Sequence, residues 1–438
     1  MFGIMKKLNF IFLVHERPQL KHYPFSNIGD DHYYYDDYVA ENTLSNNCEN
    51  CYLPANRLML DMIKNTDGKF KVSFAISGIA LEQFEQFAPE VIDSFVALAK
   101  TGKVEFLAMP YSYSLASVFD VEEFKKQVRR QTDKMEQLFG YKPEVFFNSA
   151  MIYFDEIGEK IYEMGFSAVI TEEAKQVMGW KSPHLIYNHP YTNKLKLLIR
   201  DSKLSDDINY RFSQWNWNEY PLTADKFMNW IRKTPEKETV FNIMCGYEAL
   251  GIVNNKQSGI FDFFKALPYF AIENGIGFST PTESVNKNSS VGGLSVQYPI
   301  SWTNEDKNLT AYCGNELQDE ALSKLYNLAH RVHLSKDRML TADWLRLQDT
   351  SHFYSMDTRL YINNGDHRGV SYESEYAAFM NYMNVLGDFI ERVKAHFPSS
   401  VEDEELNSLL KTIRNQNEEI LRLKEENQKL KSDRRKRK

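Results

Sequence analysis

The chain has 438 residues, of which 43% are hydrophobic, so it is long enough to bury the cores of more than one domain. Its 60 acidic and 52 basic residues give a formal net charge of −8. A mildly acidic chain of this kind does not offer the basic surface that nucleic acid requires, so nucleic acid is excluded as an expected partner. No stretch approaches the roughly 18 apolar residues of a membrane span, so a membrane is excluded as well.

The N-terminus resembles the beginning of a signal peptide, because Lys6 and Lys7 precede the apolar run Leu8–Val14. That run is short, it lacks a cleavage site of small residues, and His15, Glu16 and Arg17 follow it. We therefore expect the run to form a buried first strand, and we expect the protein to be cytoplasmic.

The first 285 residues alternate short apolar runs with longer amphipathic stretches. The predicted strands are Leu8–Val14, Phe70–Ile76, Val104–Ala108, Val145–Phe147, Ala168–Thr171, Lys196–Leu198, Val240–Cys245 and Gly277–Ser279. The predicted helices between them are Leu53–Asn65, Leu81–Thr101, Val121–Leu138, Asp155–Met164 and Thr223–Arg232. Such alternation favours an α/β fold with parallel strands, and the number of units favours an irregular (β/α)7-type barrel over residues 1–285. In parallel barrels the chemistry lies at the C-terminal ends of the strands.

Residues 286–397 are predicted to form a helical domain. It begins with a stretch rich in Asn, Ser and Gly, Asn286–Val296, which is typical of a linker. The pattern beyond it is mainly helical and predicts a bundle made of Leu309–Val332, Lys336–Gln348 and Glu373–Phe397.

A second linker, 398–405, leads to a predicted coiled coil at 406–432 and a basic tail at 433–438. The a positions hold Leu406, Ile413, Ile420 and Asn427, and the d positions hold Leu409, Gln416, Leu423 and Leu430. Isoleucine at a with leucine at d favours two parallel strands, and a single asparagine at a fixes their register. We expect a homodimer, although a single exposed amphipathic helix is the alternative. The basic tail is expected to be solvated, with contact to nucleic acid or membrane as the alternative.

Two short motifs contain residues that bind metals in other proteins. Cys48 and Cys51 form a CxxC pair, but a zinc site needs further ligands, and a redox pair normally opens a helix after a strand. We expect two reduced thiols. His330 and His333 lie three residues apart without an evident third ligand, so we expect a solvated or core pair. The sequence thus predicts neither a metal site nor a cofactor.

Several motifs resemble the α-amylase-like branch of glycoside hydrolase family 57. They are Phe12–His15, Asp30–Asp37, Tyr52–Arg57, Gly102–Phe106, Gly179–Pro183, Lys203–Asp207, Phe278–Pro281 and Tyr298–Trp302. The resemblance covers residues 5–395. It implies retaining hydrolysis or transfer at α-glucosidic bonds by two carboxyl groups about 5–5.5 Å apart, a glutamate nucleophile and an aspartate acid and base.

In this sequence both carboxylate positions hold other residues. The nucleophile motif matches Phe146–Tyr153, where the glutamate position is Ala150, and the acid motif matches Met244–Gly251, where the aspartate position is Gly246. A methyl group cannot attack carbon, and glycine has no side chain to carry a proton. Tyr113 also departs from the pattern of the branch, so the sequence predicts a non-hydrolytic protein that binds α-glucan or regulates its metabolism.

The resemblance also implies a sugar site that includes His15 and Glu105. Tyr247 and Glu248 match the family's acid motif. Sugars stack on the faces of tryptophan rings, although each ring could instead pack in the core. The predicted substrate-binding residues are His15, Glu105, Glu248, Tyr247, Trp180 and Trp217.

Two other functions are weighed against this one. A weakly active hydrolase or glucanotransferase would use displaced acids such as Glu248, Asp155 or Glu156, of which the last two are better explained as the first residues of a helix. A metal-dependent deacetylase would need an aspartate and two histidines four residues apart. No such histidine pair occurs in residues 1–285.

Overall fold

The computed structural model describes residues 5–362, 372–397, 416, 422 and 423. The predicted linker at 398–405 and the basic tail at 433–438 lie outside the described residues, as does nearly all of the predicted coiled coil.

Seven parallel strands of the described chain close into a barrel. The strands are β1 (Lys7–Val14), β2 (Val72–Ile76), β3 (Val104–Leu107), β4 (Val145–Phe147), β5 (Ala168–Thr171), β7 (Lys196–Ile199) and β8 (Val240–Gly246). One sheet has the order β3-β2-β1-β8, and the other has β4-β5-β7-β6. Parallel bridges from Ala108 to Phe146 and from Arg200 to Asn242 join the two sheets. The predicted (β/α)7-type barrel is therefore confirmed.

Two short strands extend the barrel wall. β6 (Tyr187–Asn188) pairs antiparallel with β7, and β9 (Gly277–Phe278) pairs with the beginning of β1. The predicted strand at Gly277–Ser279 is thus present, whereas β6 was not predicted, because two residues are too few to show an alternating pattern.

Strand β1 is apolar on both faces because both faces are covered. Ile11 and Leu13 belong to the core inside the barrel, whereas Phe10 and Phe12 pack against the outer helices. Continuous burial of this kind is typical of strands in parallel sheets.

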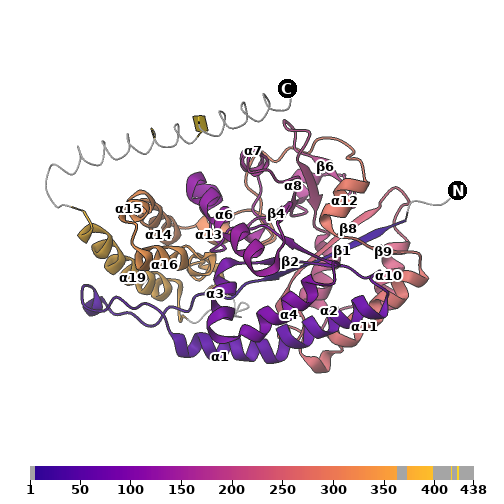
Figure 1. Ribbon diagram of the computed structural model, residues 1–438, viewed down its shortest axis with the longest axis horizontal. Helices are drawn as coiled ribbons and strands as arrows, with labels where there is room; N and C mark the ends of the chain where they lie inside the picture. Colours follow the sequence, from indigo (N-terminus) through magenta and orange to yellow (C-terminus); the bar gives the residue numbers. More distant parts are fainter. Residues whose placement is uncertain (1–4, 363–371, 398–415, 417–421, 424–438) are drawn as a thin grey trace, which may run out of the picture.

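Helices surround the strands, as Figure 1 shows. They are α1 (Asp37–Asn47), α2 (Leu53–Asn65), α3 (Gly78–Phe87), α4 (Pro89–Ala99), α5 (Ala116–Phe119), α6 (Val121–Phe139), α7 (Asp155–Glu163), α8 (Lys175–Met178), α9 (Ser202–Asp206), α10 (Ala224–Arg232), α11 (Ile260–Glu273) and α12 (Pro281–Lys287). The predicted single helix Leu81–Thr101 is two helices, because Pro89 begins α4 and cannot continue the hydrogen bonding of α3.

A π-helical turn, Cys48–Tyr52, connects α1 to α2. The sequence predicted no helix before Leu53, since α1 is polar and lacks an apolar stripe. Cys48 and Cys51 are free and buried in this turn, which confirms the prediction of reduced thiols. Burial raises the pKa of Cys48 to about 12 and that of Cys51 well above its usual value, which disfavours the nucleophilic thiolate form.

The C-terminal helices pack together beside the barrel, at the left of Figure 1. They are α13 (Thr310–Cys313), α14 (Glu316–Tyr326), α15 (Ala329–Ser335), α16 (Arg338–Leu347), α17 (Thr350–Tyr354), α18 (Arg359–Ile362) and α19 (Glu375–Ala395). The predicted helix Leu309–Val332 is divided into α13, α14 and α15, and the first break is at Gly314, where an added Cβ would lie 2.2 Å from the Thr310 carbonyl oxygen. The barrel shares the core of this part, because Tyr23 and Tyr34 pack into it.

The stretch predicted as a linker, 286–296, packs against the barrel at its end. Leu294 and Val296 are buried, and the Val296 backbone N–H donates to an Asp155 carboxylate oxygen at 2.9 Å. Of the pair His330 and His333, His333 lies 2.7 Å from Glu123, and the described residues contain no group of three metal-ligating side chains.

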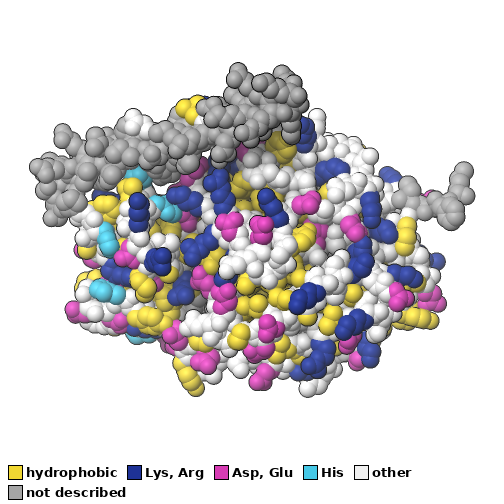
Figure 2. Space-filling model, viewed as in Figure 1, with side chains coloured by type: hydrophobic (Ala, Val, Ile, Leu, Met, Phe, Trp, Pro, Cys, Tyr) yellow, Lys and Arg dark blue, Asp and Glu magenta, His cyan; other side chains and the backbone are white. Residues whose placement is uncertain are grey.

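The outer surface carries charges of both signs. On the face shown in Figure 2, basic and acidic side chains are interspersed over the outer helices. Among the described helices, none combines the length and the apolar character needed to cross a bilayer.

Candidate functional site

A cavity of about 910 Å³ lies where the barrel strands end and the C-terminal helices begin. His15, Arg200 and Cys245 reach it from β1, β7 and β8 or from the residues that follow them. Asp349 and Tyr354 reach it from the helical part. Both parts of the fold therefore build the wall of this cavity.

His15 lines the cavity, as the sequence predicted, but both of its ring nitrogens are engaged. Nδ1 lies 2.8 Å from the Ser77 hydroxyl, and Nε2 lies 2.9 Å from an Asp349 carboxylate oxygen. The ring also stacks on Tyr113, with centroids 4.5 Å apart. A ligand can therefore pack against the His15 ring. To form a hydrogen bond with a ring nitrogen, it would have to displace Ser77 or Asp349.

Asp349 was not found from the sequence. It is fully buried, and its carboxylate accepts a hydrogen bond from the Ser351 backbone at the beginning of α17. Burial raises the pKa of Asp349, but His15 outweighs that effect and holds the pKa below its usual value. No local sequence pattern predicts this contact, because 334 positions separate Asp349 from His15.

Arg200 lies at the centre of a buried network in the cavity wall and was also missed. It is 3% exposed and lies 3.1 Å from Glu172 and 2.5 Å from Asp206, and its Nε donates to the Met244 carbonyl at 3.0 Å. Its guanidinium is 6.0 Å from the centre of the Trp302 ring. Its position directly after β7, at the C-terminal end of a barrel strand, is the sequence feature that could have predicted Arg200 as a site residue.

Ala150, at the predicted nucleophile position, is fully buried in a tight turn, Ser149–Met151. Its φ is +50° and that of Met151 is +54°, a left-handed conformation that residues other than glycine seldom adopt. Its carbonyl accepts from the Trp302 backbone at 3.0 Å, and its methyl group belongs to the core of the helical part. Ala150 therefore does not line the cavity.

Gly246, at the predicted acid position, lies opposite Leu13 at the end of β8. A side chain here would point into the top of the barrel, as Leu13 does. An added Cβ would lie 2.8 Å from a carboxylate oxygen of Glu248, so Glu248 occupies the space that an acid at position 246 would need. Burial raises the pKa of Glu248 to about 8, and the nearby Glu16 adds to this effect.

The structure places Tyr247 and Glu105 away from the cavity. Tyr247 faces outward from the barrel, is fully buried, and donates to Asn56 at 2.7 Å. Glu105 is 2% exposed inside the barrel and accepts from the Thr282 N–H at 3.0 Å and hydroxyl at 2.7 Å. Leu107 lies above it on the same interior face, two residues nearer the strand ends. The expectation of sugar contacts from these two side chains is therefore not retained.

The predicted tryptophans also lie elsewhere. Trp180 is 93% exposed at the surface, and Trp217 packs against Trp230, with ring centroids 6.4 Å apart. The tryptophan that lines the cavity is Trp302, within a motif that carried the family resemblance. A sequence cannot rank such rings, because their position depends on how distant loops meet.

Asp155 and Glu156 do not supply replacement acids. Asp155 begins α7, as predicted, and its carboxylate binds the Ser295 hydroxyl at 2.7 Å. Glu156 is exposed on the same helix.

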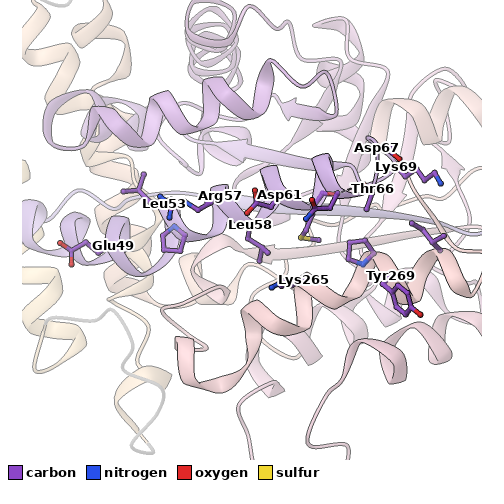
Figure 3. Close-up of a pocket in the computed structure, with 15 residues that line it drawn as sticks. Glu49, Leu53, Arg57, Leu58, Asp61, Thr66, Asp67, Lys69, Lys265 and Tyr269 are labelled. Carbon is purple, nitrogen blue, oxygen red and sulfur yellow. Dashed lines mark hydrogen bonds between the residues drawn. The ribbon is translucent and has the colours of Figure 1, made fainter.

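A second cavity, of about 820 Å³, lies between α2 and α11 on the outside of the barrel. Figure 3 shows Leu53, Arg57 and Asp61 on one side of it, and Lys265 and Tyr269 on the other. It contains none of the residues predicted to bind sugar, and it is away from the strand ends.

A buried histidine supports the segment that carries Asp206. His184 Nε2 lies 2.7 Å from Asp201, which caps α9, and Nδ1 lies 2.7 Å from Glu238. Its ring stacks on Phe241 at 4.0 Å. Burial lowers the pKa of His184, but the two carboxylates outweigh it, and the pKa lies above its usual value.

This arrangement predicts a stability that depends on pH. Because the pKa of His184 is raised on folding, its contribution is complete below about pH 6.5 and is lost as the pH rises through the higher folded value. We expect His184→Gln to lower the free energy of unfolding by about 3 kcal/mol at pH 6, since it leaves two carboxylates unpaired. Thermal melts between pH 6 and 9 test this. His22→Gln, at an exposed histidine, is the matched control and should change the free energy of unfolding by less than about 0.5 kcal/mol.

The comparisons with known proteins agree with this architecture. The family model described as glycosyl hydrolase family 57 matches residues 10–297. A curated protein of Methanocaldococcus jannaschii, described as a "Putative alpha-amylase", is 31% identical over 374 residues, which cover 82% of this chain and 79% of that protein.

Solved structures show the same fold at low sequence identity. The branching enzyme of Pyrococcus horikoshii matches with a TM-score of 0.64 and 12% identity, covering 94% of each chain. The 4-alpha-glucanotransferase of Thermococcus litoralis matches with a TM-score of 0.62 and 14% identity, covering 87% of this chain and 60% of that enzyme. The alpha-amylase of Thermotoga maritima matches with a TM-score of 0.60 and 11% identity, covering 90% and 95%. With the family model matching more than half of the chain, this protein belongs to glycosyl hydrolase family 57.

Proposed function

We propose that this chain is a non-hydrolytic member of family 57 that binds α-glucan in the cavity at the strand ends. The observation that carries the proposal is the pair of residues at the two carboxylate positions. The side chain of Ala150 is a methyl group that is buried away from the cavity, and Gly246 has no side chain. A retaining mechanism needs both groups, so binding is the part of the family's activity that this site can keep.

The lining of the cavity supports a sugar ligand. Trp302, Tyr210 and Tyr354 supply aromatic surface, and Asn209 and Asn304 supply polar groups beside it. Aromatic surface with a few polar groups is the combination on which sugar rings stack and form hydrogen bonds. Family 57 membership makes α-glucan the first class of sugar to test.

Calorimetry with maltooligosaccharides tests the binding proposal. We expect measurable heat at millimolar ligand, and we expect Trp302→Ala to weaken binding about threefold to tenfold, the effect of losing one aromatic contact. Trp180→Ala is the matched control, because Trp180 is 93% exposed and outside the cavity. An absence of heat, or an equal effect of the two substitutions, would contradict a glucan site in this cavity.

We also propose that the protein forms a parallel homodimer through its C-terminal heptads, and that it works in the cytoplasm. The support for the dimer is the sequence pattern alone, Ile at a and Leu at d with one Asn. Light scattering should give the mass of a dimer for the full chain at tens of micromolar (roughly) and of a monomer for a chain that ends at residue 403. A monomeric full-length chain would overturn the dimer.

A second candidate function, weak hydrolysis or transfer by a displaced acid, rests on Glu248. Its carboxyl occupies the space above Gly246 and, with a pKa of about 8, keeps its proton at neutral pH, as a general acid requires. No equivalent group replaces the nucleophile at Ala150. Any turnover that disappears in Glu248→Gln would favour this candidate over binding alone.

The third function considered, a metal-dependent deacetylase, needs several metal-ligating side chains close together. Among the described residues, no three metal-ligating side chains come together, in the cavity or elsewhere.

A further inference from the structure

The cavity gathers positive charge in a chain whose overall charge is negative. Of its described lining residues, five are Lys or Arg and three are Asp or Glu. The whole sequence has the opposite balance, 52 basic and 60 acidic residues. The interspersed charges on the outer face in Figure 2 show no such separation of signs.

Two of the three carboxylates in the lining lie against side chains that also belong to it. Asp206 lies 2.5 Å from Arg200, and Asp349 lies 2.9 Å from His15. These acids are therefore not directed at a ligand. Both acids are engaged within the wall, and they fix the side chains that face the cavity.

The remaining charges of the lining are mostly basic. Arg17, Lys175 and Lys307 come from the loop after β1, the first residue of α8, and the loop before α13. The fourth cation, Arg211, lies 2.5 Å from Asp207 and is held there. Lys307 donates to the Trp302 carbonyl at 3.2 Å, which places its ammonium beside the aromatic wall, and it lies 3.7 Å from the buried Glu172. Only Glu305 adds a further carboxylate to the described lining, and it is exposed.

We propose that the cavity binds an α-glucan fragment that carries an anionic group, either a phosphate ester or a sugar carboxylate, in preference to neutral glucan. The sugar rings would pack on Trp302 and the tyrosines, and the anionic group would lie against Lys175 and Lys307. Converging cations raise the local concentration of an anion and strengthen its hydrogen bonds, effects that a neutral oligosaccharide does not gain. This inference rests on the proposed glucan-binding function.

Calorimetry on the full chain with three ligands tests the inference: neutral maltotriose, maltotriose with a phosphate monoester, and maltotriose oxidised to a terminal carboxylate. We expect at least one anionic form to bind about fivefold more tightly than the neutral form, and this advantage to shrink at high salt. Lys175→Gln and Lys307→Gln should each weaken binding of the anionic form about threefold more than binding of the neutral form. Lys194→Gln is the matched control, since Lys194 is exposed, as Lys175 is, but is not part of the cavity.

The outcomes separate the two proposals. A preference for the phosphate form alone, or for the carboxylate form alone, supports the inference and identifies the anionic group. Equal binding of all three ligands overturns the inference and leaves glucan binding in place. An anionic preference that survives both lysine substitutions also overturns it, because the anion would then bind outside this cavity. If none of the ligands binds at millimolar concentration, both proposals fail.

Discussion

Reducing ends should not accumulate when this protein is incubated with starch or maltooligosaccharides. A positioned proton-transfer group contributes about 10²- to 10⁴-fold to a rate, and a covalent nucleophile divides one difficult step into two easier ones. Ala150 and Gly246 supply neither. Turnover by the unmodified chain in the usual enzyme range, about 1–10³ s⁻¹, would contradict this prediction.

Restoring the carboxylates should recover little activity. Ala150→Glu must place a charged side chain in an apolar core, at a residue with φ +50°, and Gly246→Asp must displace the Glu248 carboxyl, which would lie 2.8 Å from its Cβ. The double variant should nevertheless exceed both single variants, because the two groups act as a unit. The double variant Ala150→Gln and Gly246→Asn is the matched control of equal size, and it should show no gain.

Replacing Arg200 with methionine should lower the free energy of unfolding by about 3–5 kcal/mol. The substitution leaves Glu172, whose side chain is fully buried, without the cation 3.1 Å away, and it removes the partner of Asp206. The remaining contact of Glu172, Lys307 at 3.7 Å, is too distant to replace a hydrogen-bonded pair. Urea unfolding followed by fluorescence measures the loss.

Two further variants test whether the unpaired buried charge causes the loss of stability in Arg200→Met. Arg232→Met removes an exposed arginine and should change stability by less than about 0.5 kcal/mol. Combining Arg200→Met with Glu172→Gln should recover part of the loss, because the unpaired carboxylate is then absent. If the double variant is no more stable than Arg200→Met alone, the loss comes from packing rather than from charge.

The barrel and its strands could be predicted from the sequence because their signals are local. Each strand is a short apolar run between amphipathic stretches, and the closure into a parallel barrel follows from their number and alternation. The C-terminal helices were predicted for the same reason, although Gly314 and Pro89 divided two of the predicted helices. The positions of Ala150 and Gly246 within their motifs were likewise visible in the sequence alone.

Which side chains line the cavity was decided by tertiary structure. His15 meets Asp349 across 334 residues, and that contact occupies the ring nitrogen that a sugar hydroxyl would otherwise use. Glu105 matched a sugar-site motif, yet its place one layer below Leu107 in the barrel directs its carboxylate to Thr282. Motifs record which residues are present, whereas exposure and hydrogen-bond partners depend on how segments far apart in the chain pack against each other. The sequence by itself therefore determined the barrel and predicted the loss of both carboxylates, and only the packing of the helical part against the strand ends decided which groups face the cavity.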